Sequence, residues 1–500
     1  MKYQNPIIRG FNPDPSICRV GEDYYLVTSS FEYFPGLPIY HSKDLVNWKQ
    51  IGNCLQRAEE FPLNHVKDSG GIWAPTIRYH EGVFYVTATL EQYGNFIVST
   101  KDPAGIWSAP VWVSVGGIDP SLFFEDGKVY YCTNFSAHPG TEEITLEEID
   151  IQTGKLLTEP KTIWKGIGGG FMEAPHIYHI GEWYYLLTAE GGTNFNHMIT
   201  CARSKDIWGP YEDCPLNPIL TNVHDTSKEV QCSGHGDLFE DQNGNWWMVH
   251  LATRLCRRTM TNLGRETFLT PMRWEDGWPV ADNNRKARLN EEGPLWEEQR
   301  NKPVWKLDLT KEKWEPEILH LRTPIVDNYK KTEAELLIKP TSVGISDQAN
   351  PSVALLRQKD FDCIMNAVFN FDTCKEGDEA GIVVVLSAMF HYQMYLKRMH
   401  GKDYLVLEKE ADDMKMQVFC RPIYLEKGAN VCMEVRADKE TYEFYFASEG
   451  ESLEYVGSGS TRFLCVEGAG KCFTGTVMGL YSSCEQETEA VLKVKKWEMQ

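Results

Sequence analysis

The sequence predicts an all-β protein, in which a five-bladed β-propeller is followed by a β-sandwich. Three observations support this prediction. A short motif recurs five times in the first half of the chain, alternating apolar segments fill the second half, and aromatic residues make up 12% of the 500 residues. Aromatic residues are enriched in β-sheets, and strand motifs that recur at this spacing are typical of propellers.

The recurring motif consists of a residue pair ending in proline or glycine, a short apolar stretch, a glycine turn and a pair of aromatic residues. Its copies start at Asp14-Pro15, Ala74-Pro75, Asp119-Pro120, Ala174-Pro175 and His235-Gly236. Successive copies are 60, 45, 55 and 61 residues apart. Each copy reads as strand, tight turn and strand, which is the pattern of a β-hairpin.

Three copies continue into a second shared element, in which a serine is followed by Lys-Asp and then by a tryptophan. This element occurs at Ser42 to Trp48, Ser99 to Trp107 and Ser204 to Trp208. We interpret it as a further strand that ends in a turn. Four strands in about 45–60 residues match the size of a propeller blade. The alternative, unrelated hairpins in a sandwich, would not explain the common register.

The second half has a different pattern, and no blade motif recurs beyond about Pro324. Segments with strand-like composition lie at 367–371, 381–385, 392–396, 404–407 and 442–446. Turn residues separate them, as in an antiparallel sandwich. We therefore expect the propeller over residues 1–305, a linker over 306–323 and the sandwich over 324–500.

The composition argues against several classes of partner. With 71 acidic and 50 basic residues, the chain has a formal net charge of −21, which repels nucleic acids and anionic membrane surfaces. The apolar runs are too short to span a membrane, and the N-terminus shows no signal-peptide pattern. The 14 cysteines form no CxxC pair and have no zinc-site spacing. We expect a cytoplasmic protein with reduced cysteines; the oligomeric state, a homo-oligomer included, stays open.

The repeat brings three carboxylates to equivalent positions. Asp14 and Asp119 directly precede the shared proline, and Glu173 lies one residue further upstream. Because the innermost strands of a propeller start near its axis, these acids should converge on one small volume. Carboxylates crowded together have pKa values that move apart, so that one group is protonated and another ionised at neutral pH. Hydrolysis of a glycosidic bond requires such a pair.

A single Asp-Pro pair would be interpreted more simply as the start of a turn. Three acids in one register favour catalysis instead. Glu173 follows the apolar residues Phe171 and Met172, and an apolar environment raises the pKa of a carboxyl. Glu173 is therefore the candidate general acid.

Three further residues are candidates for contacts with the substrate. His235 stands between glycines at the fifth copy of the axial position, Trp73 could stack on a sugar ring, and Arg265 could hold a hydroxyl or carboxylate. The alternatives are a structural histidine, a tryptophan of the core and a surface ion pair.

Several motifs resemble those of the family 43 glycoside hydrolases, most closely the branch of β-xylosidases and α-L-arabinofuranosidases. They lie at residues 10–16 (GFNPDPS), 31–36 (FEYFPG), 69–75 (SGGIWAP), 190–192 (EGG) and 264–267 (GRET). The resemblance extends over nearly the whole chain, and the second half is similar to the concanavalin-like β-sandwich of that branch.

The resemblance implies an enzyme that removes pentose units from the non-reducing ends of xylo- or arabinoxylo-oligosaccharides, with inversion of configuration. It would act as a β-1,4-xylosidase, an α-L-arabinofuranosidase or both. The resemblance also implies that Asp14 is the general base, that Glu173 is the general acid and that Asp119 orients Glu173 and tunes its pKa.

The same resemblance implies a sugar subsite lined by His235 and Arg265, with Phe31 and Trp73 as its apolar walls. Phe473 is similar to a residue by which the sandwich closes the pocket. No cofactor is expected. Some family members hold a calcium ion on the propeller axis near the histidine, but the sequence has no calcium-binding loop of its own, so the metal stays open.

Two alternative functions also stay open. A non-catalytic carbohydrate-binding propeller would keep the aromatic residues but would not need three axial acids. The same fold could instead act on arabinan or on a galactan. Whether the enzyme takes terminal units or cleaves within a chain is not decided by the sequence.

Overall fold

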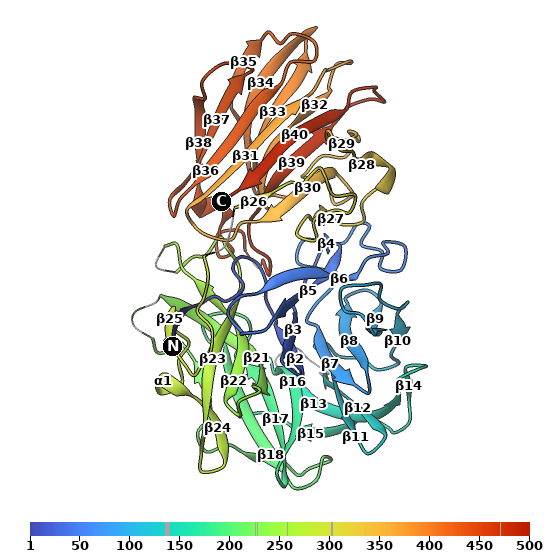
Figure 1. Cartoon of the computed structure of the whole chain (residues 1–500), viewed down its shortest axis with the longest axis vertical. Coiled ribbons are helices and arrows are strands. Elements are labelled where there is room, and N and C mark those ends of the chain that lie inside the picture. Colours follow the sequence, from blue (N-terminus) through green and yellow to red (C-terminus); the bar gives the residue numbers. More distant parts are fainter. Residues whose placement is uncertain (136–140, 226, 228, 258, 302–303, 471) are drawn as a thin grey trace.

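The structure, a computed structural model, describes residues 1–135, 141–225, 227, 229–257, 259–301, 304–470 and 472–500. It consists of two domains of β-strands, stacked one above the other in Figure 1. The helices among the described residues are α1 (Asp282–Arg285) and the short 3-10 helices η1 (Val326–Asn328) and η2 (Thr461–Leu464). The prediction of an all-β protein is therefore confirmed.

The first domain contains antiparallel sheets that follow one another along the chain. The first is built from β2 (Ser16–Val20), β3 (Asp23–Val27), β5 (Gly36–Ser42) and β6 (Lys49–Leu55). The second contains β7 (Thr76–His80), β8 (Val83–Leu90), β9 (Gly94–Thr100) and β10 (Val111–Trp112). The third contains β11 (Ser121–Glu125), β12 (Lys128–Phe135), β13 (Glu143–Asp150), β14 (Lys155–Leu156) and β15 (Lys161–Trp164).

Two more sheets and two small strand pairs complete this domain. The fourth sheet contains β16 (Glu173–Ile180), β17 (Trp183–Glu190), β18 (Met198–Ser204), β19 (Glu212–Asp213) and β20 (Leu220–Thr221). The fifth contains β21 (Val230–Glu240), β22 (Trp246–Arg254), β23 (Glu266–Glu275) and β24 (Trp278–Ala281). The pairs are β1 (Lys2–Gln4) with β25 (Asn290–Glu292), and β4 (Tyr33–Phe34) with β27 (His320–Leu321).

The first strands of these sheets form a closed ring. Strand β2 contacts β7, β7 contacts β11, β11 contacts β16, β16 contacts β21, and β21 contacts β2 again. Each copy of the sequence motif forms the expected hairpin, because each of these strands pairs antiparallel with the next strand of its sheet. The domain is a propeller, and the repeat motif marks its innermost strands.

A buried network of charges joins the sheets near the axis. Asp237 of β21 accepts hydrogen bonds from Ser16 Oγ (2.6 Å), Arg78 Nη1 (2.8 Å) and the Tyr178 hydroxyl (2.6 Å), which come from three other sheets. Burial raises the pKa of Asp237, but the charge of Arg78 and then that of His176 outweigh burial and lower the pKa well below its usual value. Asp237 is therefore an ionised link between four sheets.

We expect Asp237→Asn to destabilise the protein by about 3–5 kcal/mol, because the substitution leaves the buried Arg78 without its counter-charge. Urea denaturation monitored by tryptophan fluorescence would measure this loss. The same substitution at the exposed turn residue Asp126 is the control and should change stability by less than about 0.5 kcal/mol. A loss below about 1 kcal/mol for Asp237→Asn would show that the network is not a structural link.

The second domain is a sandwich of two antiparallel sheets. The larger sheet contains β26 (Trp305–Lys306), β28 (Tyr329–Lys331), β29 (Leu336–Ile338), β31 (Cys363–Asn370), β36 (Val431–Ala437), β37 (Thr441–Ser448), β38 (Glu454–Ser460) and β40 (Leu492–Met499). The smaller contains β30 (Ser352–Arg357), β32 (Glu379–Ser387), β33 (Phe390–Met399), β34 (Lys402–Ala411), β35 (Met414–Ile423) and β39 (Val477–Ser483). Each of the five segments predicted as strands overlaps one of these strands.

Strands β30, β32 and β39 of the smaller sheet are buried on both faces. One face contributes to the core of the sandwich, together with residues such as Trp497. The opposite face packs against the propeller, where Val353 and Val383 of the sheet join Phe11 and Phe31 in one apolar cluster. The two domains therefore share a continuous interface, and loops of the sandwich reach the mouth of the propeller.

Polar contacts reinforce this interface at a buried arginine of the connecting segment. The Arg322 backbone N–H donates to the Glu32 carbonyl (2.7 Å), and its Nη2 donates to Asp68 Oδ1 (3.1 Å). Asp68 Oδ2 in turn accepts from the backbone N–H of Ala388 in the sandwich (2.9 Å).

Among the described residues, no helix has the length and apolar character needed to cross a membrane.

Candidate active site

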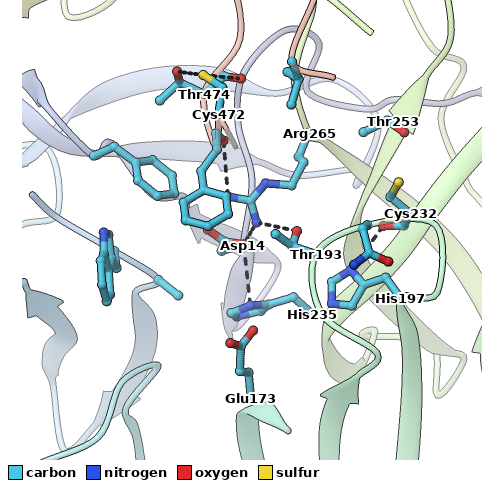
Figure 2. A pocket seen from close by; sticks show the side chains of 18 of the residues that line it. Asp14, Glu173, Thr193, His197, Cys232, His235, Thr253, Arg265, Cys472 and Thr474 are labelled. Carbon is cyan, nitrogen blue, oxygen red and sulfur yellow. Dashed lines mark hydrogen bonds and ion pairs between the residues drawn. The ribbon is translucent and has the colours of Figure 1, made fainter. Parts of the chain in front are cut away.

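A pocket of about 580 Å³ lies where the axis of the propeller meets the sandwich. All eight residues singled out from the sequence line it: Asp14, Phe31, Trp73, Asp119, Glu173, His235, Arg265 and Phe473. Figure 2 shows Asp14, His235 and Glu173 one below another, with the side chain of Arg265 reaching Asp14. The structure thus brings together residues from different sheets of the propeller and one from the sandwich.

The axial positions of the repeat share an unusual backbone conformation. Asp14, Asp119, Ala174 and His235 have φ values of 56°, 52°, 55° and 46°. This left-handed region is uncommon for residues with a Cβ atom, and such residues concentrate at functional sites. Here the conformation recurs at equivalent points of four sheets: two residues before β2 and β11 for Asp14 and Asp119, and within β16 and β21 for Ala174 and His235.

Asp14 is buried and held by three partners. The Ser29 hydroxyl donates to Oδ2 (2.5 Å), Arg265 Nη1 donates to Oδ1 (2.8 Å), and His235 Nδ1 lies 3.5 Å from Oδ1. Burial raises the pKa of Asp14, but the charges of Arg265 and His235, and then the Ser29 hydrogen bond, bring it below the usual value. Asp14 is therefore ionised at neutral pH, as a general base must be.

Asp119 and Glu173 show the opposite behaviour. Burial, followed by the charges of Glu173 and Asp14, raises the pKa of Asp119 well above its usual value. Burial and then the charge of Asp14 raise the pKa of Glu173 to about 7. Because the two carboxyls influence one another, the proton belongs to the pair. Near neutral pH the pair can supply a proton while Asp14 accepts one.

Asn134, which the sequence did not single out, ties the loops that carry these two acids. Its Oδ1 accepts from the backbone N–H of Ile118 (2.8 Å), and its Nδ2 donates to the carbonyl of Met172 (3.2 Å). Ile118 and Met172 are the residues directly before Asp119 and Glu173. The main chain of Asn134 passes so close to Gly117 that a Cβ there would lie 1.8 Å from the Asn134 carbonyl oxygen.

Arg265 connects the axis of the propeller to the sandwich. Besides Asp14, its guanidinium donates to Thr193 Oγ1 (3.2 Å) and to the carbonyl of Phe473 (3.3 Å). Its Cζ atom lies 5.6 Å from the ring centroids of both Phe31 and Phe473. With only 12% of its side chain exposed, Arg265 is not the surface ion pair that the sequence left as an alternative.

The aromatic walls of the pocket are fixed through Ser69. The backbone N–H of Phe473 donates to Ser69 Oγ (2.8 Å), and Trp73 Nε1 donates to the Ser69 carbonyl (3.3 Å). The rings of Phe31 and Phe473 are 6.0 Å apart and tilted by 39°. Since Ser69 belongs to the propeller and Phe473 to the sandwich, one wall of the pocket depends on the docking of the domains.

Two histidines, His235 and His197, line the pocket, and the sequence predicted only His235. Burial lowers the pKa of His235, which therefore is neutral at pH 7. Burial and then the charge of Arg265 lower the pKa of His197 to about 3. His197 lies against Gly234, where a Cβ would come within 2.2 Å of the ring. No repeat motif marks His197, whereas Thr193 directly follows the Glu-Gly-Gly motif.

The described residues contain no group of three or more His, Cys, Asp or Glu side chains arranged to hold a metal ion. Calcium is usually held by six to eight oxygen ligands, and the axial histidines offer ring nitrogens. The metal therefore stays open, and we assign no step of the reaction to one.

Comparison with known proteins identifies the family. A sequence model described as Glycosyl hydrolases family 43 matches residues 3–279, which cover the propeller and every candidate residue except Phe473. The chain belongs to glycoside hydrolase family 43. It is therefore a glycoside hydrolase, and the prediction made from its motifs is confirmed.

The second domain of this family 43 protein matches a sequence model as well, and two relatives cover most of the chain. A model described as Beta xylosidase C-terminal Concanavalin A-like domain matches residues 307–499. A Bacteroides ovatus protein named non-reducing end alpha-L-arabinofuranosidase is 39% identical over 494 residues, with 96% of this chain and 91% of the relative covered. A Butyrivibrio fibrisolvens xylosidase/arabinosidase is 41% identical over 423 residues, with 80% of each chain covered.

The fold of this family 43 protein also matches solved structures over its whole length. The structure titled Bacteroides ovatus Xyloglucan PUL GH43B superposes with a TM-score of 0.95 at 37% sequence identity, and all of both chains is covered. The similarity therefore includes the placement of the sandwich on the propeller.

Proposed function

We propose that this glycoside hydrolase removes single pentose units from the non-reducing ends of xylo- or arabinoxylo-oligosaccharides, as a β-1,4-xylosidase, an α-L-arabinofuranosidase or both. One observation carries the proposal: a single pocket combines an ionised Asp14 with the protonated pair of Asp119 and Glu173. The names of the relatives, which mention both activities and the non-reducing end, support this choice of substrate.

We propose that the bond is cleaved in one displacement. Asp14 accepts a proton from a water molecule, which attacks the anomeric carbon from one face of the sugar. Glu173 donates its proton to the leaving oxygen on the other face, and Asp119 keeps Glu173 protonated until that step. Such a displacement inverts the configuration at the anomeric carbon. A proton NMR spectrum recorded in the first minutes of hydrolysis should therefore contain the inverted anomer only.

In this mechanism His235 and Arg265 hold the hydroxyl groups of the terminal sugar. Phe31 and Trp73 contact its apolar surface, and Phe473 closes the pocket from the sandwich. A pocket closed in this way accepts a chain end and excludes the middle of a chain. No cofactor is needed, because the chain itself supplies both the acid and the base.

The substrate is tested by comparing kcat/KM for 4-nitrophenyl β-xyloside and 4-nitrophenyl α-L-arabinofuranoside, and then for xylobiose and arabino-oligosaccharides. We expect hydrolysis of at least one of the two aryl glycosides and release of single pentoses from an oligosaccharide. Release of internal fragments would contradict the exo mode. Activity on arabinan or a galactan, without activity on xylo-oligosaccharides, would instead favour the alternative substrate class.

The opposed pKa shifts predict the pH dependence of kcat/KM. Because Glu173 must be protonated, activity should fall as the pH rises through about 7. Because Asp14 must be ionised, activity should fall at low pH only below the usual aspartate pKa of about 3.9. Initial rates between pH 3 and 9, with stability checked at each pH, would measure both limbs. An acidic limb at pH 5–6 would mean that another group is the base.

We further propose that each sheet of the propeller is one blade, which makes five blades. The closed ring of five first strands supports this count. The bounds 1–305 and 324–500 with a linker over 306–323 remain our proposal for the domains, and the cytoplasm remains our proposal for the location. Limited proteolysis would test the linker, since cleavage within residues 306–323 should give two fragments of the sizes of the two domains on a denaturing gel.

A further inference from the structure

A second cavity, of about 950 Å³, lies where the propeller, the connecting segment and the sandwich meet. Its lining includes residues 48–51 of the propeller, 304–306 at strand β26 and 356–357 of the sandwich, and 313–317 of the segment that connects the two domains. It shares no residue with the catalytic pocket. In Figure 1, strands β26 and β30 lie at the end of the sandwich that faces the propeller.

The charge of this cavity contrasts with that of the protein. Seven of its lining side chains are lysine or arginine and three are aspartate or glutamate, although the whole chain has a net charge of −21. Two of the three carboxylates already have partners. Asp360 pairs with Arg9 and with Arg254 Nη1 (3.1 Å), and Glu315 pairs with Lys331 Nζ (3.0 Å). Three of the seven cations are paired as well: Arg9 with Asp360, Lys306 with Glu498 (2.8 Å) and Lys311 with Asp308 (2.9 Å). Glu317 is the third carboxylate, so the lining still holds more positive than negative side chains.

Arg357 is the centre of this excess charge. Its side chain lines the cavity although the residue is only 4% exposed, and its buried Nε and Nη2 make no hydrogen bond with any of the described residues. One side of the guanidinium lies on Phe11, with Cζ 5.2 Å from the ring centroid. Buried donors without acceptors cost free energy, and a charge-assisted hydrogen bond donated to an anion would remove this cost.

Lys359 lies beside Arg357 in the same electrostatic environment. Burial lowers the pKa of Lys359; Arg9 and Arg357 lower it further, whereas Glu317 and Asp360 raise it. Arg9, Arg357, Glu317 and Asp360 are thus charged groups that act on the lysine. A ligand carboxylate placed between Lys359 and Arg357 would offset the repulsion between them.

The cavity also offers flat apolar surfaces. Trp48 of the propeller and Trp314 of the connecting segment line it, and both are partly buried. Trp48 is fixed by a hydrogen bond from Nε1 to the Leu45 carbonyl (2.6 Å), and Trp314 packs edge-on against Tyr329 at 6.2 Å. Indole rings held in place by such contacts present a flat apolar face to the cavity. A face of this kind is suited to contact with a sugar ring.

We propose that this cavity is a second carbohydrate site, which binds a uronic acid unit, that is, a sugar carrying a carboxylate. Arg357 and Lys359 hold the carboxylate, and Trp48 and Trp314 contact the ring. The site goes beyond the proposed function, because it takes no part in bond cleavage and recognises an acidic sugar instead of a neutral pentose. Inorganic phosphate is also negatively charged, but it has no ring surface that the tryptophans could contact.

Isothermal titration calorimetry of the full chain with sodium glucuronate tests the site. The comparison ligands are glucose, which lacks the carboxylate, and sodium phosphate at equal ionic strength. We expect one glucuronate per chain, with glucose and phosphate bound at least about tenfold more weakly. Saturation with xylose should leave glucuronate binding unchanged. Displacement by xylose, absence of saturable binding, or phosphate binding as tight as glucuronate would overturn the proposal.

Two substitutions locate the binding. Arg357→Met keeps the apolar stem and removes the donors, so glucuronate affinity should fall at least about tenfold. Arg436→Met is the matched control, because Arg436 lies in the same domain and pairs with Glu434 at 2.7 Å outside the cavity. Lys49→Glu, at an exposed position of the rim, should weaken binding without disturbing buried residues. Wild-type affinity in either cavity variant, or an equal loss in Arg436→Met, would contradict the assignment.

Discussion

Replacing Asp14 by asparagine should lower kcat by about 10²–10⁴-fold on every glycoside substrate, because no other group can take the proton of the attacking water. Asparagine has the same shape; its Oδ1 can still accept from Arg265 Nη1, and its Nδ2 can donate to Ser29 Oγ, where the two oxygens of Asp14 accept from these groups. The loss should therefore be in kcat, with a smaller effect on KM. It should be similar for aryl glycosides and for xylobiose, since both need the same water.

The control for Asp14 is Asp23→Asn in the same sheet, whose side chain pairs with His41 away from the pocket. This variant should keep the wild-type rate. A further test uses Asp14→Ala and sodium azide, an anion that can attack the anomeric carbon without a base. Azide should restore part of the rate for an aryl glycoside and yield a glycosyl azide. A variant at Asp14 that retains more than about one tenth of the activity would exclude Asp14 as the base.

Replacing Glu173 by glutamine should have an effect that depends on the leaving group. A sugar leaves poorly without a proton, so the rate on xylobiose should fall by about 10²–10⁴-fold. A 4-nitrophenolate leaves readily without protonation, so the rate on the aryl xyloside should fall far less. The decrease in activity above pH 7, which the pair of Asp119 and Glu173 causes in the wild type, should also disappear on the aryl substrate.

The control for this substitution is Glu182→Gln, which changes a glutamate exposed by 72% and paired with Lys205. It should behave as the wild type on both substrates. An equal loss on xylobiose and on the aryl xyloside would mean that Glu173 does not act as the general acid. A pH profile unchanged in Glu173→Gln would assign the basic limb to a different group.

The repeat explains why the three acids could be found from the sequence. Asp14 and Asp119 occupy the same point of the motif, and the structure shows the same left-handed backbone at both. Asn134 and His197 were missed because they lie outside the motif, in strand β12 and in the turn before β18. Their importance comes from contacts between different parts of the chain, which no local pattern records.

Burial explains which strands of the sandwich were visible in the sequence. Strand β31 alternates between buried and less buried residues, so its pattern was recognised. Strand β35 is exposed along almost its whole length at the edge of its sheet, and β30 is buried at every position. Strand β30 lacks the alternation that identifies a strand covered on one face, whereas β32, which is also buried almost throughout, was recognised by its continuous run of Ile and Val residues. The burial of β30 on both faces depends on the docked propeller.

The position of Phe473 late in the chain has a consequence for the synthesis of the enzyme. Its loop can adopt its place against Ser69 only when the sandwich has formed, and the sandwich includes β40 (Leu492–Met499) between β29 and β31. A ribosome that has translated the entire propeller has thus made every acid needed for cleavage, but not yet the wall that restricts what enters. Selectivity is the last property that the growing polypeptide acquires.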